Sequence, residues 1–347
     1  MDSIEVILQK DNITFDDFAV LLSPEAEDYL ELLAMASQKI TLANFGRTIQ
    51  LYTPLYLANF CDNYCLYCGF NADNQIERKK LSPTELKQEA RVISSSGLKH
   101  ILLLTGESRQ MSPVSYIVEC VKVLRGYFSS ISIEVYPLSQ AEYRLLVEAG
   151  VDGLTIYQET YDQDTYCQVH PRGPKSDYAF RLDAPERGAK AGMRNINIGT
   201  LLGLADWRKE IFFCGQHAKY LQDKFPEIEI GVSLPRLRPH QGSYQPACLV
   251  SDKNICQIIA ALRIFLPHVG ITVSTRENAE FRKNLIPLGV TRMSAGSSTE
   301  VGGRIMQKNN PRGSCQFEIS DHSSVSQVKA MIEEKGYQPV LKDWMVF

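Results

Sequence analysis

Short, almost wholly apolar runs alternate along the chain with longer segments in which apolar residues recur every three or four positions. The runs are rich in β-branched residues and contain few polar positions, a pattern typical of parallel strands that are buried on both faces. Eight such runs follow one another, at 51–60, 100–105, 131–137, 153–158, 195–202, 229–235, 270–275 and 290–295. We expect each run to form one strand of a parallel sheet.

The segments between the runs begin and end with helix signals. Ser82-Pro83-Thr84-Glu85 supplies an N-cap serine, a proline at the first helical position and a glutamate at the third. Ser112-Pro113 repeats the start signal, and Gly97, Gly150 and Gly192 each follow a helical segment where a stop is expected. This order of strand, helix, glycine and strand indicates a β/α array.

The array runs from residue 51 to 336, which is about 36 residues per unit and suits a (β/α)₈ barrel. We therefore predict an α/β fold of the TIM-barrel type, with an N-terminal helical extension at 1–50 and a short tail at 337–347 packed on or near the barrel. A doubly wound sheet is the alternative. That fold would place a glycine-rich phosphate loop after the first strand, whereas here the first run ends in cysteines.

Three of the nine cysteines form a C-x₃-C-x₂-C motif at Cys61, Cys65 and Cys68, directly after the first run. A structural zinc site takes four ligands, and no further cysteine or histidine lies nearby. Three thiolates would instead leave one iron of a [4Fe–4S] cluster open to another ligand. A zinc site and three buried cysteines without a metal remain the alternatives.

Composition and charge narrow the class of protein. The 347 residues carry a net charge of −3 and are 44% hydrophobic. The lack of a basic excess argues against nucleic-acid binding, and no apolar stretch is long enough to span a membrane. The N-terminus shows no signal-peptide pattern and the other six cysteines are scattered, so we expect a cytoplasmic protein with reduced thiols.

Charged residues collect where the runs end. Glu107 follows the second run, Glu134 lies within the third and Glu159 follows the fourth. Arg236 follows the sixth run, and Ser274 and Arg276 lie at the end of the seventh. Because the active site of a barrel lies at the carboxyl ends of its strands, these side chains are expected to share one rim.

The cysteine motif, with the aromatic Tyr67 before its last cysteine, resembles the signature of the radical S-adenosylmethionine (SAM) superfamily. The rest of the sequence is similar to the 2-iminoacetate synthase family, the tyrosine lyases of bacterial thiamine biosynthesis. The resemblance covers residues 45–347 and is carried by segments 51–70, 105–107, 157–161, 233–239, 274–277, 316–321 and 342–344.

The resemblance implies a reaction and its partners. A [4Fe–4S] cluster on the three cysteines and SAM would generate a 5′-deoxyadenosyl radical. The radical would abstract hydrogen from the amino group of L-tyrosine, and cleavage of the Cα–Cβ bond would yield 2-iminoacetate and p-cresol. A flavodoxin- or ferredoxin-type protein would donate the electron, and thiazole synthase would be the partner that receives the product.

The resemblance also implies site residues. Those expected to bind the cofactor are Tyr67, Phe70, Glu107, Glu134, Glu159 and Arg181, and those expected at the substrate are Arg276, Ser274, Glu159 and Arg236. Each has a structural alternative. Glu107 could be a solvent-facing loop residue, Glu159 could form a structural ion pair, and Arg181 could be a surface helix arginine paired with Glu186. Arg276 could pair with Glu277 or Glu280, and Arg236 or Arg238 could merely hold the acids of the rim.

Three other functions are alternatives to a tyrosine lyase of thiamine biosynthesis. A sibling lyase could cleave tryptophan, or could cleave tyrosine in hydrogenase maturation. The latter family carries an additional C-terminal cysteine cluster, whereas only Cys315 follows the predicted barrel here. Sulfur insertion of the biotin-synthase type lacks ligands for a second cluster. A non-catalytic metal-binding barrel is the third alternative.

Overall fold

Eight parallel strands close into a barrel in the computed structural model, which describes residues 3–306 and 315–342. The first strand pairs with both the second and the eighth, so the sheet has no open edge between them and is not doubly wound. The strands are β1 (Thr48–Ala58), β2 (His100–Thr105), β3 (Ser130–Glu134), β4 (Gly153–Thr155), β5 (Asn195–Gly199), β6 (Glu229–Ser233), β7 (Gly270–Val273) and β8 (Arg292–Ser294). All eight predicted strands are confirmed.

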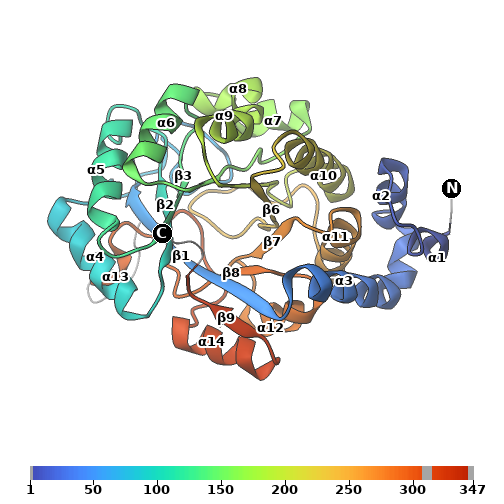
Figure 1. Cartoon of the computed structure of the whole chain (residues 1–347). Coiled ribbons are helices and arrows are strands. Elements are labelled where there is room, and N and C mark those ends of the chain that lie inside the picture. The colour runs from blue at the N-terminus through green and yellow to red at the C-terminus, as the bar shows by residue number, and fades with distance from the viewer. Residues whose placement is uncertain (1–2, 307–314, 343–347) are drawn as a thin grey trace.

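Helices surround the strands, as Figure 1 shows. They are α4 (Pro83–Ser95), α5 (Val114–Leu124), α6 (Gln140–Ala149), α7 (Gln163–Val169), α8 (Tyr178–Leu182), α9 (Ala184–Ala191), α10 (Trp207–Lys224), α11 (Asp252–Phe265), α12 (Ala279–Leu285) and α13 (Gly303–Met306), with 3₁₀ turns at Pro174–Ser176 and Ile286–Leu288. None of the helices within 3–306 and 315–342 is long and apolar enough to cross a bilayer.

The predicted helix signals act as expected. The Ser82 hydroxyl accepts a hydrogen bond from the backbone N–H of Glu85, and the Glu85 carboxylate accepts one from the N–H of Ser82. Ser139 and Glu142 form the same reciprocal pair at the start of α6. Gly150, at φ 114°, ends that helix in the left-handed conformation that favours glycine.

The N-terminal helices attach to the outside of the barrel beside α11 (Figure 1). They are α1 (Ile4–Ile7), α2 (Phe15–Leu21), a 3₁₀ turn (Glu25–Tyr29) and α3 (Leu30–Phe45). The ring of Phe18 is fully buried and stacks on Phe265 at 4.3 Å between centroids. The side-chain amide of Gln257 donates to the carbonyls of Leu21 and Ser23, which fixes the end of α2 to α11.

The C-terminal part adds an element that the pattern does not predict. After α14 (Val325–Glu334), the short strand β9 (Gln338–Val340) pairs in parallel with the beginning of β1, outside the barrel. Its three residues are half-buried or exposed and carry no apolar run. Asp343 and Trp344, which contribute to the family resemblance, lie outside the described residues.

Residues 315–321, here called the C-terminal strap, contact the loops at the carboxyl ends of the strands. The N–H of Ser320 donates to the carbonyl of Thr275 after β7, and the N–H of Glu318 donates to that of Pro239 after β6. The buried carboxylate of Asp321 pairs with the buried guanidinium of Arg282 in α12. The strap therefore joins the last part of the chain to the rim of the barrel.

Candidate active site

A cavity lies at the carboxyl ends of the strands, between the loops that follow β1, β2 and β4 and the C-terminal strap. Eight of the predicted residues line it, namely Cys61, Cys65, Cys68, Phe70, Glu107, Glu134, Glu159 and Arg181. Lys175, Asn63, Tyr56 and Gln316 also line it. The structure thus brings most of the predicted site together from segments far apart in the chain.

Backbone contacts hold the cysteine loop on both sides. The N–H of Asp62 donates to the carbonyl of Glu107 at 2.7 Å, and the N–H of Gly69 donates to the carbonyl of Gln316 at 2.9 Å. At Gly106, a Cβ atom would lie 2.3 Å from the carbonyl oxygen of Phe60, so only glycine permits this approach of the loops after β1 and β2.

The three cysteines suit an iron–sulfur cluster. Burial raises the pKa of all three thiols, that of Cys68 to about 11, while the nearby Lys175 ammonium works in the opposite direction. Within the described part of the chain, no three acidic, thiol or imidazole side chains converge on a single metal ion. Cysteines that share a [4Fe–4S] cluster bind different irons, so they need not meet that geometry. Cys61, Cys65 and Cys68 would hold the cluster, leaving one iron for another ligand.

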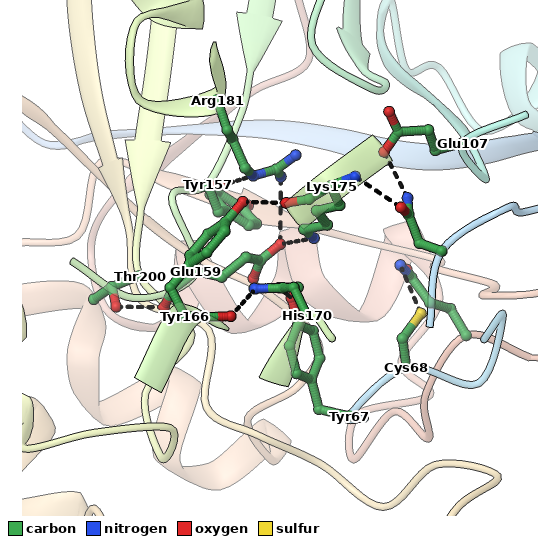
Figure 2. Close-up of polar contacts among 12 residues, drawn as sticks. Tyr67, Cys68, Glu107, Tyr157, Glu159, Tyr166, His170, Lys175, Arg181 and Thr200 are labelled. Atoms are coloured by element: carbon green, nitrogen blue, oxygen red, sulfur yellow. Dashed lines mark hydrogen bonds and ion pairs between the residues drawn. The ribbon is translucent and has the colours of Figure 1, made fainter. Parts of the chain in front are cut away.

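Glu159 is the centre of a buried charge cluster, shown in Figure 2. Its Oε1 lies 2.6 Å from Nζ of Lys175 and 3.4 Å from a guanidinium nitrogen of Arg181. Burial alone would raise the pKa of Glu159, but the two cations outweigh it and the pKa lies below its usual value. One carboxylate thus faces two cations, so these three side chains together carry a net positive charge.

The backbone of Glu159 is strained. It has φ 72°, and it is the one non-glycine residue with positive φ among residues 3–306 and 315–342. The hydroxyl of Thr200 and the N–H of Leu201 both donate to the carbonyl of Glu159, each at 2.7 Å. Such a conformation costs about 1–3 kcal/mol and persists where the surroundings fix it, often at functional sites.

Glu134 differs from Glu159 although both line the cavity. Burial and the charge of Glu159 raise the pKa of Glu134 to about 7, and the more distant Arg276, Arg181 and Lys175 only partly oppose this. The site therefore holds one carboxyl group that stays ionised and one that exchanges its proton near neutral pH. Environments that separate the pKa values of two acids in this way are common at active sites.

Glu107, Phe70 and Tyr67, three of the predicted residues, lie around the cysteines. The carboxylate of Glu107 accepts a hydrogen bond from the side-chain amide of Asn63 at 2.6 Å, so it faces the site and not only solvent. Phe70 is buried and meets Tyr56 edge to face. The Tyr67 hydroxyl lies 2.7 Å from Nε2 of His170 (Figure 2), so the Tyr67 side chain is held in the protein interior by this hydrogen bond.

Arg276 has no carboxylate partner within the described residues. One of its guanidinium nitrogens donates to the backbone carbonyl of Arg236 at 3.2 Å, and its guanidinium carbon lies 3.4 Å from the ring centroid of Phe317 in the strap. The hydroxyl of Ser274 accepts from the backbone N–H of Arg276 at 3.4 Å. The expected alternative of an ion pair with Glu277 or Glu280 is not found. Neither Arg276 nor Ser274 lines the cavity described above.

Arg236 and Arg238 both bind Glu277. Arg236 also contacts Asp252 at 2.7 Å and the carbonyl of Val250 at 3.0 Å, and it does not line the cavity. The contact of Arg236 with substrate therefore stays a prediction. The ion pairs of Arg236 and its position outside the cavity argue against that contact. The structure instead shows it supporting Arg276 through its backbone carbonyl.

Three residues of the site carry no signal in the pattern. Lys175 lies in a 3₁₀ turn between α7 and α8, Asn63 lies within the cysteine motif, and Gln316 lies in the strap. None follows a predicted strand or shows a recognisable spacing. The segments that carry the family resemblance include Asn63 and Gln316 but not Lys175.

Comparison with known proteins agrees with the fold and with the resemblance to the radical SAM superfamily. The model of the radical SAM superfamily matches residues 55–214, and that of the biotin and thiamin synthesis associated domain matches residues 233–338. The chain is 40% identical to the 2-iminoacetate synthase of Escherichia coli (strain K12) over 98% of its own length and 90% of that protein. The chain belongs to the 2-iminoacetate synthase family. The corresponding enzyme of Salmonella typhimurium is 39% identical over the same shares.

Solved structures place the family in a wider group. The [FeFe]-hydrogenase maturase HydG is similar with a TM-score of 0.90 and 33% identity, covering 97% of this chain and 75% of that chain. Methylornithine synthase shares the fold with a TM-score of 0.76 at 20% identity. Membership of the radical SAM superfamily identifies the cofactors of this chain as a [4Fe–4S] cluster and SAM, which removes zinc as an alternative.

Proposed function

We propose that this 2-iminoacetate synthase homologue is a radical SAM lyase that cleaves the Cα–Cβ bond of L-tyrosine. The products are 2-iminoacetate and p-cresol, and 2-iminoacetate supplies the thiazole of thiamine. The observation that carries the proposal is a three-cysteine cavity at the barrel mouth of a chain 40% identical to a curated 2-iminoacetate synthase over nearly its whole length.

The cluster and SAM supply the 5′-deoxyadenosyl radical when both are bound. The protein positions them and limits access of water and other hydrogen donors. Glu107 and Glu134 would supply negative charge for the ammonium group of SAM, and Arg181 would bind its carboxylate. Glu159, which pairs with Lys175 and Arg181, lines the same cavity and would bind the ribose or the substrate amine.

The substrate carboxylate is assigned to Arg276 and Ser274. Arg276 is the basic residue of the predicted rim whose guanidinium meets only a backbone carbonyl and an aromatic face within the described residues. A guanidinium stacked on a ring keeps its edge free for two parallel hydrogen bonds to a carboxylate. The Arg236 carbonyl sets the direction of that edge.

The proposal includes partners and a compartment. An exogenous one-electron donor of the flavodoxin or ferredoxin type reduces the cluster, and thiazole synthase takes the hydrolysis-prone 2-iminoacetate. None of the nine cysteines is in a disulfide, which is typical of proteins in a reducing compartment and supports a cytoplasmic enzyme.

A tyrosine lyase of the hydrogenase-maturation type is the second candidate, favoured by the high structural similarity to HydG. The chain covers 75% and 79% of two HydG chains, against 90% of the 2-iminoacetate synthase of E. coli, and identity is also lower. These differences favour 2-iminoacetate synthesis. A tryptophan-cleaving enzyme would use the same carboxylate-binding arginine.

Anaerobic turnover tests the proposal. Reconstituted protein, SAM, dithionite and L-tyrosine are expected to give 5′-deoxyadenosine and p-cresol by mass spectrometry. The Cys65→Ala variant serves as the control and is expected to lose the cluster absorbance and both products. If 5′-deoxyadenosine forms without p-cresol, the substrate assignment is wrong and L-tryptophan is tested next. If Cys65→Ala still cleaves SAM, the cluster assignment is wrong.

A further inference from the structure

The side chain of Gln316 connects the C-terminal strap to the cysteine motif. Its Oε1 lies 2.6 Å from the hydroxyl of Tyr56 in β1, and its Nε2 lies 3.9 Å from Sγ of Cys68. Gln316 lines the same cavity as the three cysteines. The residue is separated from Cys68 by 248 positions in the chain, so only the fold brings the two together.

The two contacts fix the direction of the amide. Burial and the charge of Glu134 raise the pKa of Tyr56 well above its usual value, so its hydroxyl keeps its proton and can donate to Oε1. A cysteine thiolate can only accept, so the NH₂ group is the half of the amide that suits Cys68. The opposite orientation would turn a carbonyl oxygen towards the thiolate, and two acceptors cannot form a hydrogen bond.

The main chain of Gln316 is held equally firmly. Its carbonyl accepts from the N–H of Gly69, next to Cys68, at 2.9 Å, and its N–H donates to the carbonyl of Thr299 at 3.3 Å. A Cβ atom on Gly69 would lie 2.4 Å from the carbonyl oxygen of Cys315 and 2.8 Å from that of Gln316. The close packing of strap and cysteine loop therefore keeps the amide at the sulfur.

We propose that Gln316, oriented by Tyr56, donates an N–H···S hydrogen bond to the Cys68 thiolate and makes the cluster easier to reduce. The inference rests on the proposed function only in requiring the cluster. One-electron reduction adds negative charge to the cluster and its thiolates. A donor aimed at a ligand sulfur stabilises that charge more in the reduced state than in the oxidised state, which moves the potential in the positive direction.

The test is an EPR-monitored redox titration of the full-length reconstituted protein without SAM or substrate. Gln316→Met keeps the length of the side chain but removes the donor, so its midpoint potential is expected to be more negative than that of the wild type. Tyr56→Phe leaves Gln316 in place but releases its carbonyl, so a smaller shift in the same direction is expected. Ser320→Ala is the matched control on the strap, because Ser320 contacts Thr275 only through its backbone N–H, and no shift is expected.

Iron and sulfide are measured for each variant. An unchanged midpoint in Gln316→Met with full cluster content overturns the inference but leaves the proposed function intact. Loss of the cluster from both Gln316→Met and Tyr56→Phe also overturns it, because the contact would then be needed for assembly and not for tuning. Wild-type protein that takes up no cluster overturns the proposed function itself.

Discussion

Glu134 and Glu159 line one cavity, yet the pKa values of their carboxyl groups are shifted in opposite directions. Lys175 and Arg181 keep Glu159 ionised at distances of 2.6 and 3.4 Å, whereas Glu134 has no ion pair within the described residues and its pKa rises to about 7. The difference between the two pKa values comes from the charged partners of each carboxyl group and not from burial alone. A bound ammonium group would lower the pKa of Glu134 by stabilising its charged form.

This contrast predicts a pH-dependent stability of the ligand-free protein. The folded-state pKa of Glu134 is above its usual 4.5, so ionisation disfavours the folded state, and stability is lost as the pH rises from about 4.5 to about 7. Glu134→Gln removes this loss. We expect a higher Tm than that of the wild type at pH 8 and little difference at pH 5, measured by calorimetry. Equal effects at both pH values would contradict the raised pKa.

Arg276 gives a prediction about binding. Lysine keeps the charge but not the planar pair of donors, so Arg276→Lys should weaken L-tyrosine binding about tenfold or more, or about 1.5–3 kcal/mol. SAM binding should change much less. Calorimetric titration of each ligand separates the two, with the exposed Arg91→Lys on α4 as the control. Equal losses for both ligands would show that Arg276 does not select the substrate.

At the scale of single elements, the strand ends show how far the apolar pattern extends. The predicted run 195–202 contains β5, which ends at Gly199, and the run 229–235 contains β6, which ends at Ser233. Leu201, Leu202 and Leu234 remain buried because the loops after the strands pack over the rim. Apolar periodicity locates the strands correctly, but it cannot mark where hydrogen-bonded pairing stops and the loops that build the site begin.

The junction between β1 and β2 is sensitive to one methyl group. Gly106→Ala would place Cβ 2.3 Å from the Phe60 carbonyl, next to Cys61, so the cysteine loop must shift. We expect a stability loss of about 1–3 kcal/mol by urea unfolding and reduced iron content after reconstitution. Gly126→Ala is the control, since its nearest neighbour would be the Val123 carbonyl at 3.5 Å. Full iron content in Gly106→Ala would show that the close approach is not required.

At the scale of the whole molecule, the site depends on contacts that no local pattern shows. The three cysteines and the acids after the strands follow from motif and topology, because parallel strands bring their carboxyl ends together. Lys175 could not be predicted, since its partner Glu159 is reached only through the fold of the loop between α7 and α8. Gln316 and Phe317 could not be placed either, because the strap returns to the barrel mouth after the eighth strand is complete.

The buried pair of Arg282 and Asp321 fastens the strap to the barrel, and both side chains are at most 1% exposed. Asp321→Ala leaves the guanidinium unpaired and should cost about 3–5 kcal/mol in urea unfolding. Burial raises the pKa of Asp321, but Ser323 and Arg282 outweigh burial and hold it below 3.8. The contribution of the pair is therefore present above about pH 4 and is lost below it.

The double variant Arg282→Met with Asp321→Leu is the matched comparison. It removes both charges from the buried site, so it should recover much of the stability that Asp321→Ala loses. A double variant no more stable than Asp321→Ala would show that the cost comes from packing and not from the unpaired charge.

The pairing of β9 with the beginning of β1 has a consequence for biogenesis. The cysteine motif leaves the ribosome early, but β1 finds its last neighbour only when residues 338–340 have been made. The strap that covers Cys68 is synthesised 248 positions after it. For most of the time of translation the three thiols therefore have no finished pocket. The pocket around the three cysteines is therefore complete only after residues 315–340 have been synthesised and have packed against the barrel.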